Sequence, residues 1–212
     1  MACQQHPARL DDAPGSDVAL PVVDLQRAAL SDPGRRRLVA EEIVKAGKEF
    51  GFFQVVNHVV AEDVMNVNYY PPCPDPSVTL GLLPHCDRHL LTVLSQGDVA
   101  GLQARYRGRW ILVRPVPGAF IINFGHQMEI VTNGVLASVE HRALTNSAVA
   151  RMSVATLIMP KMDCLIGPAP EMVSEENPAK FREFVFREFM AAYDTAAASR
   201  EDVLEYFRIE DH

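Results

Sequence analysis

The chain is poor in the features that mark several large classes of protein. Its 212 residues include only four cysteines, Cys3, Cys73, Cys86 and Cys164, which show no C-x-x-C spacing. That scatter excludes the common zinc ribbons and dithiol redox motifs. No apolar run lies near the N-terminus, and none approaches the roughly 18 residues that a membrane span needs. We therefore expect a cytoplasmic protein with no secretory signal and no membrane partner.

Positive charge is also scarce. Lysine and arginine total 20 against 27 acidic residues, which gives a formal net charge of -7. Residues 35–37 are three consecutive arginines, too short a cluster to form a nucleic-acid-binding stripe. We therefore expect no nucleic-acid partner, and the oligomeric state is not indicated. The 48% of hydrophobic residues is ordinary for a folded domain.

The first part of the chain predicts a strand, a helix and a second strand. Residues 19–25 are a short β-like run, and residues 52–57 form another. Between them, Asp32 and Pro33 suit the N-cap and the first position of a helix, and Gly51 suits its end. Apolar residues recur at helical spacing within this segment, at Val39, Ile43, Ala46 and Phe50.

The middle of the chain predicts many short strands separated by turns. The candidate strands are residues 90–94, 101–106, 109–113, 119–124, 137–142 and 153–159. Arg107 and Gly108 predict a tight hairpin between two of them. Short strands at this spacing favour a sandwich, a jelly roll or a barrel. After Pro178, four apolar residues recur at helical spacing and predict a helix with one apolar face. These residues are Phe181, Phe184, Val185 and Phe189. A second short helix is predicted over residues 201–207.

Two short patterns could carry chemistry. His85 and Asp87 lie two residues apart, so on an extended strand their side chains point to the same side. His141 is the natural candidate for a third ligand from another strand. Two histidines and one carboxylate on one side of a metal leave positions open, as iron(II) needs in order to bind a cosubstrate and oxygen. Taken alone, H-x-D is a weak signal that also fits a surface histidine beside an aspartate. Arg151 and Ser153 would also share one strand face, where they suit the binding of a carboxylate. Taken alone, this pair also fits an exposed arginine on a strand edge.

Residues 68–74, Asn-Tyr-Tyr-Pro-Pro-Cys-Pro, resemble a signature of the plant-type iron(II)- and 2-oxoglutarate-dependent dioxygenases. That family includes flavonoid, gibberellin and alkaloid oxidases. The resemblance continues in register over residues 66–160, and residues 20–25 and 51–58 resemble the N-terminal segment of the family. The matching positions are Gly81, His85, Asp87, 101–103, Trp110, 115–118, Asn133, Gly134, 139–142, Arg151 and Ser153.

The resemblance implies a mainly β protein with flanking helices and a double-stranded β-helix (jelly-roll, cupin-like) core. It implies Fe(2+) held by His85, Asp87 and His141, with 2-oxoglutarate and O2 as cosubstrates. It further implies that four residues bind 2-oxoglutarate, namely Arg151, Ser153, Tyr70 and Asn68. His58, His89 and His126 match no ligand position, although His126 is a candidate for the pocket wall.

The chain departs from the family pattern at several places, and two of them bear on the fold and the site. Family members have a long, largely helical stretch before the segment that begins at Asn68, and here the flanking blocks are almost joined. Its loss should leave apolar surface facing water. Cys86 stands where serine or threonine is usual, which places an oxidisable thiol between two implied ligands.

These observations predict four segments. They are a mobile tail (1–17), a truncated N-terminal dioxygenase segment (18–65), a jelly-roll core (66–165) and a C-terminal helical segment (166–212). The implied activity couples decarboxylation of 2-oxoglutarate to hydroxylation or desaturation of a small specialised metabolite or hormone. The alternative is a truncated remnant that binds iron or a partner without turnover. A sugar-binding jelly roll would leave the aligned ligands as a coincidence.

Overall fold

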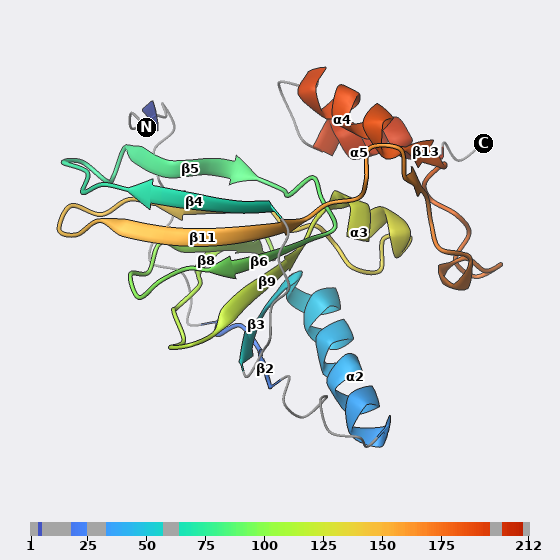
Figure 1. Cartoon of the computed structure of the whole chain (residues 1–212), viewed down its shortest axis with the longest axis horizontal. Helices are drawn as coiled ribbons and strands as arrows, with labels where there is room; N and C mark the ends of the chain where they lie inside the picture. The colour runs from blue at the N-terminus through green and yellow to red at the C-terminus, as the bar shows by residue number, and fades with distance from the viewer. Residues whose placement is uncertain (1–3, 6–17, 25–32, 57–63, 196–200, 210–212) are drawn as a thin grey trace.

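A computed structural model describes residues 4–5, 18–24, 33–56, 64–195 and 201–209. Strands dominate, and helices flank them: α2 lies below the strands in Figure 1, and α4 and α5 lie at the upper right. The expectation of a mainly β protein with flanking helices is confirmed. The predicted N-cap Asp32 and the histidine His58 lie outside the described residues.

The first sheet holds five strands in the order β1-β5-β10-β7-β8. All of its pairs are antiparallel. Its strands are β1 (Gln4–Gln5), β5 (Thr79–His85), β10 (His141–Leu144), β7 (Leu102–Tyr106) and β8 (Arg109–Leu112). The β7–β8 hairpin turns at Arg107 and Gly108, which have φ angles of 48° and 77°, so the tight turn predicted there is confirmed.

The second sheet holds six strands in the order β2-β3-β9-β6-β11-β4. Only β2 and β3 pair in parallel. Its strands are β2 (Val22–Asp24), β3 (Phe52–Val56), β9 (Phe120–Phe124), β6 (Leu91–Ser95), β11 (Arg151–Ile158) and β4 (Val64–Tyr70). The packed apolar residues of both sheets include Phe52, Leu94, Leu102, Ile111 and Ile121, which form one buried cluster. Two sheets closed over one apolar core are the architecture of a jelly roll.

Helix α2 (Pro33–Phe50) covers part of the second sheet. Its buried residues Val39 and Ala46 pack with Phe53 and Ile122 of the strands, as the helical spacing predicts. The helix ends at Gly51, whose φ of +64° favours glycine. The expected strand, helix and strand are all present in the described part of this region.

The strand expected over residues 137–142 begins instead at His141. A side chain holds part of the preceding backbone, because the Ser138 N–H donates to Glu129 Oε2 at 2.7 Å, whereas the Glu140 carbonyl accepts from the Arg105 N–H of β7 at 2.8 Å. Glu129 belongs to the short helix α3 (His126–Val131). A carboxylate nine residues earlier in the chain therefore helps to fix the backbone ahead of this strand.

The prediction of one helix carrying Phe181, Phe184 and Val185 is wrong. Phe181 forms an isolated bridge with Arg208, Phe184–Val185 is strand β13, and helix α4 (Phe186–Thr195) begins only afterwards. Strand β13 pairs with β12 (Leu165–Ile166), and the short 3-10 helix η1 (Pro170–Met172) lies between these strands in the chain. The aromatic residues still share one buried cluster with α5 (Glu201–Phe207), the second helix that the sequence predicts. Strand pairing, rather than helical spacing, places them there.

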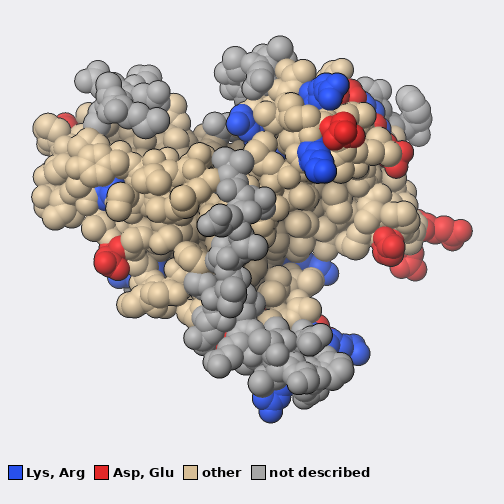
Figure 2. Space-filling model, viewed as in Figure 1, with Lys and Arg blue, Asp and Glu red and all other residues tan. Residues whose placement is uncertain are grey.

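Strand β4 presents apolar side chains to solvent. Met65, Val67 and Tyr69 are 65%, 61% and 59% exposed, and they alternate with residues that face the interior. Figure 2 shows few charged side chains over the strands on this face, whereas charges gather over the C-terminal helices. The expected exposed apolar surface is therefore present on β4. That the loss of a helical stretch uncovered this surface stays a prediction. Among the described helices, none has the length and apolar character needed to cross a membrane.

Candidate active site

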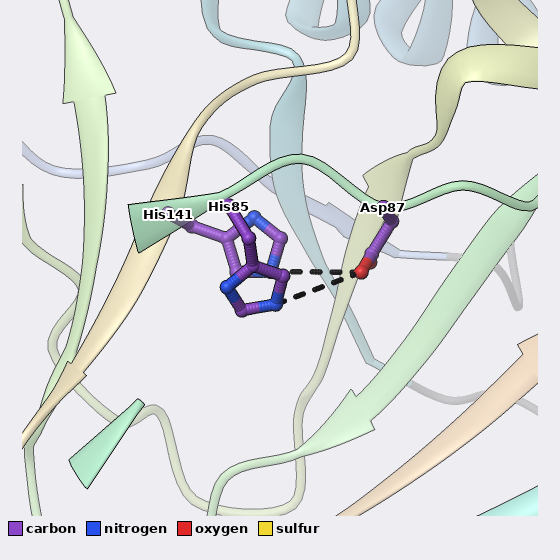
Figure 3. Close-up of side chains that lie close together, drawn as sticks. All are labelled: His85, Asp87 and His141. Carbon is purple, nitrogen blue, oxygen red and sulfur yellow. Dashed lines mark ion pairs between the residues drawn. The ribbon is translucent and has the colours of Figure 1, made fainter. Parts of the chain in front are cut away.

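Two histidines face each other across paired strands. Strands β5 and β10 are antiparallel neighbours, and His85 and His141 are direct partners in their register. Their ring centroids are 4.2 Å apart. Figure 3 shows both imidazoles turned toward the carboxylate of Asp87. Sheet register therefore brings together two residues that are far apart in the sequence.

Asp87 does not lie on the strand that carries His85, so the expected i, i+2 arrangement on one strand is wrong. Strand β5 ends at His85, and the chain then bends. The Asp87 carbonyl accepts a hydrogen bond of 2.8 Å from the N–H of His126 at the start of α3. Asp87 Oδ1 nevertheless lies 3.8 Å from Nε2 of each histidine. One ligand atom from each of the three residues lies within 4.8 Å of the others.

Backbone carbonyls orient both imidazole rings. Nδ1–H of His85 donates to the Leu83 carbonyl at 2.8 Å, and Nδ1–H of His141 donates to the Val139 carbonyl at 3.1 Å. These bonds select the tautomer whose Nε2 lone pair is available. Both lone pairs belong to the nitrogens that face Asp87. The cluster is therefore arranged to donate two nitrogen atoms and one oxygen atom to a metal.

The second oxygen of Asp87 is held by side chains that the sequence analysis did not identify. Oδ2 accepts hydrogen bonds from the Thr92 hydroxyl and from Asn123 Nδ2, the latter at 2.5 Å. His89 Nε2–H donates to the Thr92 hydroxyl at 2.5 Å, so His89 supports the cluster although it is not one of the three predicted ligands. Thr92 and Asn123 are register partners on β6 and β9, which no local sequence pattern indicates.

This network favours the ionised carboxylate. Burial alone would raise the pKa of Asp87, but electrostatic attraction by the His141 ring and the interactions with His89 and Thr92 outweigh burial and lower the pKa below its ordinary value. With Oδ2 occupied by two donors, Oδ1 is left facing the histidines. A carboxylate held in this way is suited to bind a metal through one oxygen.

The four residues expected to bind 2-oxoglutarate form two facing pairs. Arg151 pairs with Tyr70 and Ser153 pairs with Asn68 across strands β11 and β4. Arg151 and Ser153 are 2% and 3% exposed, and the intervening Met152 faces solvent. The predicted sharing of one face by Arg151 and Ser153 is thus present. All four residues line the same cavity of about 280 Å³ as the histidine–aspartate cluster.

Arg151 is a buried cation without a carboxylate partner among the described residues. Its Nε–H donates to the Val99 carbonyl at 3.2 Å, and its guanidinium lies 5.1 Å from the centre of the Tyr70 ring. Burial lowers the pKa of Arg151, although Tyr70 partly opposes this effect. An arginine remains charged even so. A buried charge is costly unless it is paired, so this part of the cavity is suited to an anion.

Two other residues named in the sequence analysis have different surroundings from those expected. The thiol of Cys86 donates to the Ser138 carbonyl at 3.5 Å, and burial, with the nearby charges of Glu140 and Glu129, raises its pKa to about 12. It is therefore a protonated thiol rather than a reactive thiolate. His126 does not line the cavity. Its ring makes an edge contact with Phe189 at 6.0 Å, and burial lowers its pKa to about 4, so it is neutral.

A jelly roll whose cavity holds two histidines, one aspartate and a buried arginine has the features of a mononuclear metal oxygenase. The chain belongs to the 2OG-Fe(II) oxygenase superfamily, whose model matches residues 61–160. A second model, the non-haem dioxygenase in morphine synthesis N-terminal family, matches residues 20–68. The two matches meet at residues 61–68, where the sequence analysis predicts a missing stretch.

Relatives within this family include two barley enzymes. The chain is 57% identical over 131 residues to 2'-deoxymugineic-acid 2'-dioxygenase of Hordeum vulgare, covering 62% of the chain and 39% of that relative. It is 58% identical over 126 residues to mugineic-acid 3-dioxygenase of the same species, covering 59% and 37%. The chain therefore spans about two fifths of the length of these curated relatives.

A solved structure supports the fold. JOX2, crystallised in complex with 2OG, Fe and JA, superposes with a TM-score of 0.78 at 24% identity. The similarity covers 91% of the chain and 90% of that structure. At this identity the superposition shows a shared fold, and the jelly-roll expectation is confirmed.

Proposed function

We propose that the chain binds Fe(2+) through His85, Asp87 and His141 and uses 2-oxoglutarate and O2 to oxidise a small organic molecule. The reaction would release succinate and CO2 and hydroxylate or desaturate a specialised metabolite or hormone. One observation carries this proposal: a cluster that could hold a metal, and a buried arginine with no carboxylate partner in the described part of the chain, line the same cavity. Together they match the two ends of a 2-oxo dicarboxylic acid.

The cluster fits iron(II) by its chemistry. Two imidazole nitrogens and one carboxylate oxygen on one side of a metal leave coordination positions open for a cosubstrate and oxygen. When bound, iron supplies the redox chemistry that the side chains lack. The Leu83 and Val139 carbonyls hold the two rings in the ligating tautomer. Thr92 and Asn123 hold the carboxylate.

The residues of β11 and β4 would orient 2-oxoglutarate. The Arg151 guanidinium can bind the distal carboxylate with two parallel hydrogen bonds, and the Ser153 hydroxyl, on the same face, can add a third. Tyr70 and Asn68 face them from β4 and would complete the binding site. Binding both ends of the cosubstrate fixes its position, which is a major contribution that a protein makes to such reactions.

An organic acid is the first substrate to test. The two barley relatives act on 2'-deoxymugineic acid and mugineic acid by their names. We propose 2'-deoxymugineic acid as a probe substrate for this chain.

The proposal is tested by succinate release from the purified chain with iron, 2-oxoglutarate and O2, after a melting experiment shows cooperative unfolding. His85→Ala removes one nitrogen ligand and should abolish iron-dependent release. Arg109→Gln is the control, because Arg109 is an exposed residue of β8, which is an edge strand of the first sheet. This variant should release succinate like the unchanged chain. Release that persists in His85→Ala would contradict the proposed ligands.

A folded chain that releases no succinate would support the alternative of a non-catalytic remnant. Two observations favour keeping that alternative: the chain spans about two fifths of the length of its relative, and β4 exposes apolar side chains to solvent.

The four segments predicted from the sequence stay proposals for the domain organisation. They are residues 1–17, 18–65, 66–165 and 166–212. We also propose a cytoplasmic location, since none of the described cysteines forms a disulfide.

A further inference from the structure

The cavity has a second cationic group that the proposed binding of metal and 2-oxoglutarate does not use. Arg88 follows the proposed ligand Asp87 and lines the same cavity. Its backbone is fixed, because its carbonyl accepts a hydrogen bond of 3.2 Å from Gln127 Nε2. Its guanidinium lies 5.4 Å from the centre of the Tyr193 ring on α4. Arg88 and Tyr193 are both half-buried, which places them at the rim of the cavity.

The charges in the cavity leave Arg88 unbalanced. Asp87 is the only acidic residue among the described residues of the lining. Bound iron(II) and Arg151 would supply three positive charges, which Asp87 and the 2-oxoglutarate dianion would balance. Arg142 is engaged elsewhere, because its Nε–H donates to Gln103 at 2.7 Å and its guanidinium stacks 4.2 Å from the centre of the Trp110 ring. No carboxylate of the described residues forms an ion pair with Arg88.

We propose that Arg88 binds a carboxylate of the substrate, so that the substrate is an organic anion, and that Tyr193 is the positioning residue that holds the guanidinium at the rim. This inference rests on the proposed function. The guanidinium offers a planar pair of donors that matches a carboxylate. The aromatic ring restricts the arginine by a cation–π contact and leaves its edge free for the anion. Leu82 and Leu157, which also line the cavity, offer apolar contact for the remaining part of the substrate.

The test uses the full chain loaded with Mn(2+) in place of iron(II) and with 2-oxoglutarate, in oxygen-free buffer so that no turnover can occur. Isothermal titration calorimetry compares the binding of 2'-deoxymugineic acid with that of its methyl ester, in which the carboxylates are neutral. The unchanged chain should bind the acid more tightly. Arg88→Gln should weaken acid binding by about tenfold to hundredfold, the effect of losing a charge-assisted hydrogen bond, and leave ester binding as it was.

Matched variants separate a specific contact from a general loss of charge or packing. Arg88→Lys keeps the charge and should restore part of the acid affinity. Arg109→Gln removes an exposed arginine elsewhere and should change neither affinity. Tyr193→Leu should weaken acid binding by about threefold with no effect on the ester, whereas Tyr193→Phe should retain it because the ring is kept.

The outcomes distinguish this inference from the proposed function. A preceding titration of the Mn(2+)-loaded chain with 2-oxoglutarate checks the proposed function: a chain that binds no 2-oxoglutarate contradicts that function itself. Two results with normal 2-oxoglutarate binding would overturn the role of Arg88 alone. In the first, the unchanged chain does not bind the acid. In the second, Arg88→Gln and the unchanged chain bind the acid with equal affinity. Equal losses for acid and ester would also overturn it, because a charge contact must discriminate between them.

Discussion

Replacing Thr92 by valine should weaken metal binding while leaving the three proposed ligands in place. The Thr92 hydroxyl donates to Asp87 Oδ2 and accepts from His89 Nε2–H at 2.5 Å. Valine has nearly the same shape but neither donor nor acceptor. Asp87 Oδ2 would keep the Asn123 amide and the longer contact of 3.5 Å with His89 Nε2, so the carboxylate would be held less firmly opposite the histidines.

The magnitude follows from the single hydrogen bond that is lost to a charged group. Such a bond contributes about 1.5–3 kcal/mol, and each 1.4 kcal/mol corresponds to about a tenfold change in affinity. Loss of an outer partner of a metal ligand typically weakens metal binding by about 10- to 100-fold, which agrees. The buried His89 N–H also loses its acceptor, at a cost of about 1–3 kcal/mol in the free energy of unfolding. The melting temperature should therefore fall by several degrees.

The assay is a calorimetric titration of the metal-free chain with Mn(2+), with melting curves of the same samples. Thr156→Val is the matched control, because Thr156 lies on β11 opposite Met65 and Val93 and outside the cluster. The control should bind Mn(2+) as the unchanged chain does. Unchanged Mn(2+) affinity in Thr92→Val would refute the role of the Thr92–Asp87 hydrogen bond. An equal loss in Thr156→Val would refute the specificity of the effect.

Three further predictions test other parts of the structure. Arg151→Met should weaken 2-oxoglutarate binding by about 10- to 100-fold in calorimetry, and unchanged affinity would contradict the role of Arg151. The same substitution should raise the melting temperature of the ligand-free chain, because it removes a buried charge. Phe189→Ala should lower the free energy of unfolding in urea by about 3–5 kcal/mol, and a loss under about 1 kcal/mol would show that the C-terminal aromatic cluster is not well packed. Gly51→Ala should lower the free energy of unfolding in urea more than Gly108→Ala does. Both glycines have a positive φ, but only at Gly51 would the added methyl group meet a neighbouring side chain, that of Val139. Equal losses would contradict that close contact.

Local patterns account for much of the β framework. The strands around Thr92, Trp110 and Ile121 have the alternating or buried apolar pattern that predicts strands, and the Arg107–Gly108 turn was identified by its residue types. Arg151 and Ser153 share a face because a strand alternates, so their common orientation was predictable from spacing alone.

Long-range contacts determine what local patterns could not indicate. The support of Asp87 comes from Thr92 and Asn123, which meet only through the register of β6 with β9. The chain bends at Asp87 because the start of α3 holds its carbonyl, a contact between residues far apart in the sequence. Phe181 and Phe184 have helical spacing, but pairing with residues from other segments keeps them extended. Tertiary contacts outweigh local propensity in each case.

The most direct test of the proposed site is a crystal structure of the chain grown with Mn(2+) and 2-oxoglutarate. We expect one metal ion bound by Nε2 of His85, Nε2 of His141 and an oxygen of Asp87, with the keto acid end of 2-oxoglutarate at the metal and its far carboxylate at Arg151. A metal ion bound at other residues, or 2-oxoglutarate lying away from Arg151, would contradict the assignment.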